Sequence, residues 1–237
     1  DEISREILQN CLLPIGLITS LYGVIGAIGA ERLRRFVGFM ILSSIGTLLT
    51  AIALFSTEAW AASLYYLVHS TLIGAAFYLL CGWITSQRGE FKDHFKVAPQ
   101  MKQHKALALA YFAIALMMAG LPPFSGFLGK VFILQAAASS PYQLLIILTI
   151  LAVSLLSIIA MTRVGFILFW RASRPEDNPH APEFKTYHAL PAKAPKRNDS
   201  AVYLLLAGLT AYMVFAAPIY SYARSTAEQM RSNALYE

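Results

Sequence analysis

Apolar runs of about twenty residues recur along the sequence, and short polar segments separate them. A helix of about 20 residues crosses the hydrocarbon core of a bilayer, which is roughly 30 Å thick. Only 14% of the residues are charged and 57% are hydrophobic, whereas about a quarter of the residues in a soluble domain are charged. The sequence therefore predicts an all-α integral membrane protein whose aqueous parts are small.

We expect about seven transmembrane segments, including one discontinuous helix. Their predicted ranges are 12–30, 36–55, 61–85, 106–121, 127–138, 144–170 and 201–220. The predicted organisation is an interfacial or linking segment over 1–10, a transmembrane bundle over 11–172, a polar Pro-rich loop over 173–200, a terminal transmembrane helix over 201–222 and an exposed tail over 223–237. Because the chain begins at Asp1 without a signal region, we expect it to be part of a longer protein.

The formal net charge of +6 lies in the loops, where it bears on topology or lipid headgroups and not on nucleic acid. If every apolar segment crossed the membrane, the basic loops 31–35 and 86–105 would lie on one side. The basic loop 171–200 would then lie on the other side, and the positive-inside rule would give no orientation. It would give one if the short segment 127–138 were re-entrant, because the basic loops would then lie on the same side.

The stretch GLPPFSGFLGK interrupts the apolar pattern at residues 120–130. Pro122 and Pro123 end the preceding helix, because proline has no N–H donor and clashes with the preceding turn. Ser125 is predicted to cap the next helix, and Gly126 leaves room for another backbone. Lys130 follows in the second turn. It is either an interfacial lysine that snorkels or an ionisable group of a discontinuous helix, able to exchange a proton inside the bundle.

Two further ionisable residues lie within apolar spans. His69, near the middle of the third segment, is either a hydrogen-bonded packing residue or a proton-relay step, since imidazole titrates near neutral pH. Arg163, near the end of the sixth segment, either snorkels to the surface or pairs with a carboxylate that this sequence does not contain. These three residues are the candidates for an ion pathway.

Patterns typical of covalent or cofactor chemistry are missing from the sequence. It contains no nucleophile–base arrangement, phosphate loop, paired carboxylates or spacing of zinc, haem or iron–sulfur ligands. Cys11 and Cys81 lie in apolar runs, where we expect small hydrophobic side chains and no disulfide or metal pair. We therefore expect no cofactor and no metal.

Three stretches resemble a known group of membrane proteins. ERLRRFVGFMILSSIGTLLTAIAL, LYYLVHSTLIGAAFYLLCG and AGLPPFSGFLGKVFILQAA occur in this order. Together they resemble the C-terminal half of the antiporter-like proteins, which comprise D subunits of multisubunit Mrp (Mnh, Pha) cation/proton antiporters and proton-pumping subunits of respiratory complex I. The resemblance covers about residues 10–172 and is greatest to the D subunits.

The resemblance implies two inverted five-helix repeats, each with a discontinuous helix that carries a charged residue. Residues 12–30 would end the first repeat, and 36–172 would form the second. Lys130 matches the charged position of the second broken helix, and His69 matches the histidine of the relay helix. Gly74 stands where many members carry a lysine, so passage of a proton through this half would need water.

The function implied is a secondary transporter subunit, not an enzyme, that exchanges Na⁺ or K⁺ for H⁺ in the bacterial inner membrane. It would assemble with subunits of the Mrp A, B, C, E, F and G types. Lys130 is the first candidate for handling the proton and His69 the second, with Arg163 third as a gate or ion-pair partner. Two alternatives remain: a proton-translocating subunit of a complex I-type oxidoreductase, and a structural membrane subunit without transport of its own.

Overall fold

The computed structural model describes residues 2–171 and 200–231, and throughout this part the regular elements are helical. The helices are α1 (Glu2–Gly29), α2 (Leu33–Ile52), α3 (Thr57–Gln87), the 3₁₀ turn η1 (Gly89–Phe91), α4 (His104–Ala119), α5 (Ser125–Ala137), α6 (Gln143–Gly165), the π-helical turn η2 (Phe166–Trp170), α8 (Ser200–Val214) and α9 (Ala216–Arg231). Among the described residues, α1, α2, α3 and α6 are each long and apolar enough to cross a membrane. The predicted all-α membrane fold is confirmed.

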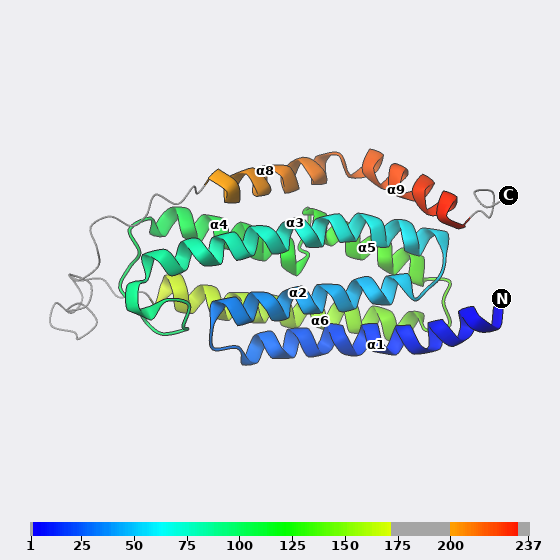
Figure 1. Cartoon of the computed structure of the whole chain (residues 1–237), viewed down its shortest axis with the longest axis horizontal. Helices are drawn as coiled ribbons and strands as arrows, with labels where there is room; N and C mark the ends of the chain where they lie inside the picture. Colours follow the sequence, from blue (N-terminus) through cyan, green and yellow to red (C-terminus); the bar gives the residue numbers. More distant parts are fainter. Residues whose placement is uncertain (1, 172–199, 232–237) are drawn as a thin grey trace.

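Helices α4 and α5 lie end to end and form one broken crossing (Figure 1). They contain 16 and 13 residues, or about 24 and 20 Å at 1.5 Å per residue. Each is therefore too short to cross the hydrocarbon core, whereas the pair matches the full-length helices beside it. The segments predicted at 106–121 and 127–138 are thus two halves of the discontinuous helix.

This broken crossing changes which loops share a side. The α1–α2 turn, the α3–α4 loop and the two ends that flank residues 172–199 all lie at one end of the bundle, on the left in Figure 1. The sequence places three basic residues in 31–35, five in 86–105 and six in 171–200. Counting the fourth and fifth segments as separate crossings was the error that divided these loops between two sides.

The ends of the chain also differ from the prediction. Helix α1 is continuous from Glu2 through the predicted boundary between residues 10 and 11. The predicted terminal helix over 201–222 consists of α8 followed by α9, with a bend of 78° between them. Helix α9 packs on α3 and buries Ala223 and Ala227, whereas most of the other side chains in 223–230 are exposed, as predicted for this part of the chain. The predicted loop, except for Ser200 at the start of α8, and residues 232–237 lie outside the described part.

Helices α1 and α2 are in close contact along a row of small residues. The Ser43 hydroxyl on α2 donates a hydrogen bond to the Ser20 carbonyl on α1 over 2.8 Å. A β-carbon at Gly46 would collide with the Ser20 backbone. Glycine at this position therefore allows the two backbones to approach, as small residues do at helix contacts in membranes.

Arg88 organises the loop that joins α3 to α4. It is 5% exposed, and its guanidinium donates to the carbonyls of Lys92 (3.3 Å), His94 (2.6 Å) and Lys96 (2.6 Å). Burial lowers the pKa of Arg88 to about 10, so the group stays charged at neutral pH. The loop is consequently wrapped around a fixed cation.

We expect Arg88→Leu to loosen this loop, because three backbone carbonyls lose a charged donor. The cost should be about 3 kcal/mol, given that a hydrogen bond to a charged group contributes about 1.5–3 kcal/mol. Limited proteolysis of the full-length protein should show faster cleavage within 89–96. Lys102→Ala, which changes an exposed lysine in the same loop, should leave cleavage unchanged. Equal cleavage of all three proteins would show that Arg88 does not hold the loop.

Candidate ion-pathway site

Lys130 lies in α5, in the second turn after the break, and is only 7% exposed. Its Nζ donates to the carbonyl of Ala119 over 2.8 Å and to the Ser154 hydroxyl over 2.9 Å. The amine thus joins three elements: its own helix, the end of α4 and the middle of α6. This geometry is that of the discontinuous-helix interpretation, and the amine does not reach the surface as a snorkelling lysine would.

The end of α4 supplies an acceptor because the helix stops there. The last carbonyls of a helix have no intrahelical N–H partner, and the Ala119 carbonyl receives the lysine instead. Gly120 closes the helix in the left-handed conformation with φ of +80°, and Leu121 N–H returns to the Leu116 carbonyl over 3.1 Å. A glycine at this position is the usual way to end a helix.

We expect Gly120→Ala to weaken the site. A side chain is strained at this φ, and the added β-carbon would lie 3.1 Å from Lys130 Nζ. The strain should cost about 1 kcal/mol of stability, and the displaced amine should slow transport. The measurement is the melting temperature and exchange rate of the full-length complex in membranes. Gly29→Ala, where the added carbon meets nothing within 4 Å, is the control, and an equal effect of the two changes would contradict the account.

His69 on α3 reaches the same break from the other side. It is 2% exposed, and its Nδ1 lies 2.9 Å from the Ser125 hydroxyl. A β-carbon at Gly126 would collide with the Met117 carbonyl and would lie 2.8 Å from His69 Nε2. The close approach predicted for Gly126 is therefore made to both α4 and the histidine.

Ser125 does not cap α5 as predicted. The N-cap is Phe124, which makes no side-chain cap bond, and Ser125 is the first residue of the helix itself. Its hydroxyl is instead paired with the imidazole. The serine thereby ties α3 to the N-terminal end of α5 rather than stabilising that end locally.

The structure brings Lys130 and His69 to one region. Both contact the α4–α5 break, the Lys130 amine at the Ala119 carbonyl and the His69 imidazole at the Ser125 hydroxyl.

Arg163 is not part of this cluster. Its guanidinium donates to the Ala30 carbonyl over 3.0 Å and lies 5.9 Å from the ring centre of Phe95. It is about 13 Å further along α6 than Ser154, at 1.5 Å per residue. Arg163 joins the C-terminal part of α6 to the turn after α1, at the basic end of the bundle. Its role as a gate or ion-pair partner stays a prediction.

Sequence reasoning missed several hydroxyl groups beside the lysine. Ser154 accepts from the amine. On the other side, Ser44 donates to the Tyr66 hydroxyl over 3.1 Å and lies 2.6 Å from Ser70. The available signal was the repeated occurrence of serine and threonine inside apolar runs at helical spacing, since such side chains form hydrogen bonds between membrane helices.

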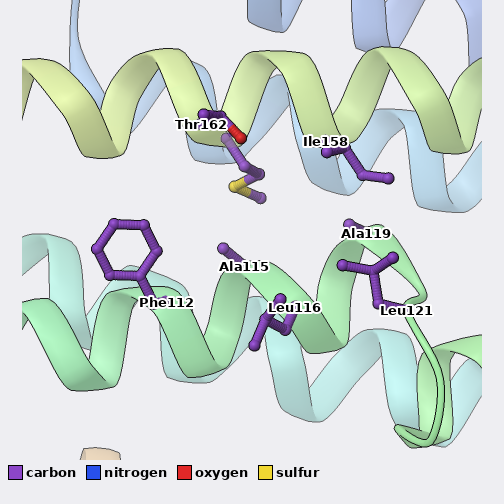
Figure 2. A pocket seen from close by; sticks show the side chains of 8 residues that line it. Phe112, Ala115, Leu116, Ala119, Leu121, Ile158 and Thr162 are labelled. Carbon is purple, nitrogen blue, oxygen red and sulfur yellow. The ribbon is translucent and has the colours of Figure 1, made fainter.

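An apolar pocket lies close to the Lys130 site. It has a volume of about 60 Å³ and is lined by residues of α4, the break and α6, among them Phe112, Leu116 and Ile158. Figure 2 shows Phe112, Ala115 and Leu116 facing Ile158 and Thr162 across it. Apart from the Thr162 hydroxyl its side chains are apolar, so this pocket offers no ionisable group.

Metal ligands do not gather in the described residues. No three His, Cys, Asp or Glu side chains in 2–171 and 200–231 approach one another closely enough to hold an ion. Both cysteines are free; Cys81 is buried and Cys11 is exposed. The functional groups at the break are therefore an amine, an imidazole and hydroxyl groups.

The structure is a helical membrane bundle with one discontinuous crossing, and a buried amine lies at the break in that crossing. A polytopic protein of this class holds an ionisable group away from water. The chain belongs to the NADH:quinone oxidoreductase/Mrp antiporter transmembrane family, which matches residues 1–157. The resemblance seen in the sequence is thereby confirmed.

Individual relatives agree with this assignment. The chain is 29% identical over 229 residues to the D subunit of the Na⁺/H⁺ antiporter of Alkalihalophilus pseudofirmus, and the match covers 96% of this chain and 44% of the relative. Its fold is similar to a chain of the Mrp complex from Dietzia sp. DQ12-45-1b, with a TM-score of 0.74, 23% identity and coverage of 95% and 48%. It is also similar to a chain of respiratory complex I from Thermus thermophilus, with a TM-score of 0.68, 20% identity and coverage of 96% and 46%. The chain thus spans about half the length of these proteins.

Proposed function

We propose that this chain is the C-terminal part of the D subunit of an Mrp-type antiporter and contributes a proton half-channel built around Lys130. The observation that carries the proposal is the buried amine held between the last carbonyl of α4 and Ser154 of α6. The whole protein would exchange Na⁺ or K⁺ for H⁺. The proton gradient drives the exchange, and no step needs a cofactor.

The residues at the break have separate roles in the proposed proton transfer. Lys130 holds the proton at Nζ, and the Ala119 carbonyl and Ser154 hydroxyl stabilise the ammonium form as acceptors. A movement of α4 against α5 or α6 removes an acceptor, which favours release of the proton from the poorly hydrated amine. His69, tied to α5 by Ser125, takes the proton or returns it, because charge on one group disfavours charge on the other.

The orientation of the bundle in the membrane follows from the basic loops, which lie at the same end of the bundle. Cytoplasmic loops carry an excess of lysine and arginine, so the end with 31–35 and 86–105 faces the cytoplasm. The opposite end, with the first turns of α1 and the last turns of α9, faces the periplasm. The location proposed is the bacterial inner membrane, and the partners proposed are subunits of the Mrp A, B, C, E, F and G types.

The partner subunits distinguish this proposal from the complex I-type alternative. Affinity purification of the full-length protein from its native membrane should recover small antiporter subunits. Addition of Na⁺ or K⁺ to everted vesicles should dissipate a preformed proton gradient. Recovery of iron–sulfur subunits, with proton pumping driven by quinone reduction, would instead establish the complex I-type function.

A further inference from the structure

The bend between α8 and α9 lies against the broken crossing. Helices α8 and α9 both pack on α3, and α8 also contacts α5 (Figure 1). Tyr212 precedes the bend and Tyr220 follows it. The centres of their rings lie 4.8 and 6.5 Å, respectively, from the centre of the Tyr65 ring on α3. The bend thus brings tyrosines from two helices to one residue.

Phe132 on α5 completes this group, which we call the elbow cluster: Tyr65, Phe132, Tyr212 and Tyr220. The ring of Phe132 stacks on that of Tyr220, with centres 4.0 Å apart, and meets the Tyr65 ring edge-on at 5.2 Å. The Tyr212 hydroxyl donates to the Tyr65 carbonyl over 2.9 Å. Aromatic pairs of this kind stabilise a structure beyond the area that they bury. The cluster therefore joins α3, α5, α8 and α9.

Phe132 and Lys130 point to opposite sides of α5. They are two residues apart, which corresponds to a rotation of about 200° in a helix. The Lys130 amine accordingly reaches Ala119 and Ser154, on α4 and α6, whereas Phe132 faces α3 and α9. Rings behind the helix therefore oppose movement of α5 away from the acceptors of the amine.

Two attachments fix α5 on either side of the lysine. The Ser125 hydroxyl, paired with His69 on α3, fixes the first turn, which precedes Lys130. Phe132 fixes the part of the helix that follows it. Hydrogen bonds weaken steeply once their geometry is lost. A shift of α5 toward the elbow would therefore weaken the contacts of the amine with both acceptors.

We propose that the elbow cluster positions Lys130, with Tyr220 as a positioning residue that acts through Phe132. The inference rests on the proposed function. The Tyr220 ring fills the space behind α5 and keeps the amine aligned on Ala119 and Ser154. A smaller side chain leaves a gap into which α5 relaxes, and the amine loses this alignment. The bend between α8 and α9 thereby supports the transport site from outside it.

The Tyr220 ring provides the first test. In the full-length complex, Tyr220→Leu should lower cation/proton exchange in everted vesicles about three- to tenfold per assembled complex, as weakening of one hydrogen bond would. Tyr220→Phe keeps the stacked ring and should exchange at the wild-type rate. Tyr222→Leu changes a neighbouring ring that is 76% exposed, and as the control it should also exchange normally. Equal losses in Tyr220→Leu and either of the other two variants would overturn the inference.

A double variant separates positioning from a general loss of structure. In Ser154→Ala one of the two acceptors of the amine is already gone, so Tyr220→Leu has less alignment to disturb. It should then cost about twofold or less, and the losses of the two single variants should not multiply. A side chain that only stabilises the fold would cost the same factor in both backgrounds, and that result would overturn the inference.

Tyr65 provides a second pair of variants that leaves α9 unchanged. Its hydroxyl is buried and has no hydrogen-bond partner within the described residues, so Tyr65→Phe should keep the exchange rate. Tyr65→Leu removes the ring that meets Phe132, and it should lower the rate as Tyr220→Leu does. Normal exchange in Tyr65→Leu and Tyr220→Leu, with Lys130→Ala inactive, would overturn the positioning role and leave the proposed function intact. Full exchange in Lys130→Ala would overturn both.

Discussion

Lys130→Ala in the full-length protein should abolish rescue of salt-sensitive cells that lack their own antiporter. The change removes the amine that bridges Ala119 and Ser154. Loss of a positioned proton-transfer group lowers a rate by about 10²–10⁴-fold, which is more than growth at high salt tolerates. Rescue is scored as growth against salt concentration at normal expression, with assembled complex quantified in the same membranes.

Two variants sharpen this result. Lys130→Arg keeps a charge but does not release its proton, because arginine stays protonated in proteins; it should therefore fail as well. Lys102→Ala, at an exposed position, should rescue fully. Rescue by Lys130→Arg would mean that a fixed charge is enough, and rescue by Lys130→Ala would favour the structural subunit without transport.

Gly126→Ala should have the second largest effect, because one methyl group meets two parts of the site. The added carbon would collide with the Met117 carbonyl and would lie 2.8 Å from His69 Nε2. Overpacking of this kind costs about 1–3 kcal/mol, and relief requires α5 to move away from α4 and α3. We expect a lower melting temperature of the complex and an exchange rate reduced about tenfold or more, since misplaced proton-transfer groups lose efficiency steeply.

Gly208→Ala is the control for this prediction. Gly208 lies within α8, and an added carbon there meets nothing within 4 Å. Alanine favours a helix over glycine by about 1 kcal/mol, so stability should stay the same or rise. If Gly126→Ala kept both its melting temperature and its exchange rate, the close packing of His69 against the break would not matter to function.

Much of the fold could be predicted because a membrane span has a length requirement that the sequence displays. The apolar runs gave α2, α3 and α6 to within a few residues. Hydropathy does not reveal that two short segments share one crossing, which is why α4 and α5 were counted separately. The bend between α8 and α9 has a local signal, because Pro218 lies in the first turn of α9 and has no N–H to continue α8. The packing of α9 on α3 has no such signal.

The site could be predicted only where chemistry is unusual for its surroundings. A lysine after Pro-Pro in an apolar run is conspicuous, and so is a histidine in the middle of a span. The partners are ordinary residues: Ser154 comes from α6, and the Ala119 carbonyl is a backbone atom. Ser125 looked like a cap because caps are local, but its partner His69 lies 56 residues earlier in the chain. Pairings between helices cannot be read from spacing within one helix.

The central claim is that a buried amine at the α4–α5 break handles the transported proton. The direct measurement is how fast added Na⁺ or K⁺ dissipates a preformed proton gradient in everted vesicles. Wild type and Lys130→Ala are compared at equal amounts of assembled complex. We predict rapid dissipation with wild type and, with Lys130→Ala, none above vesicles that lack the complex. Dissipation at the wild-type rate by Lys130→Ala would contradict the account.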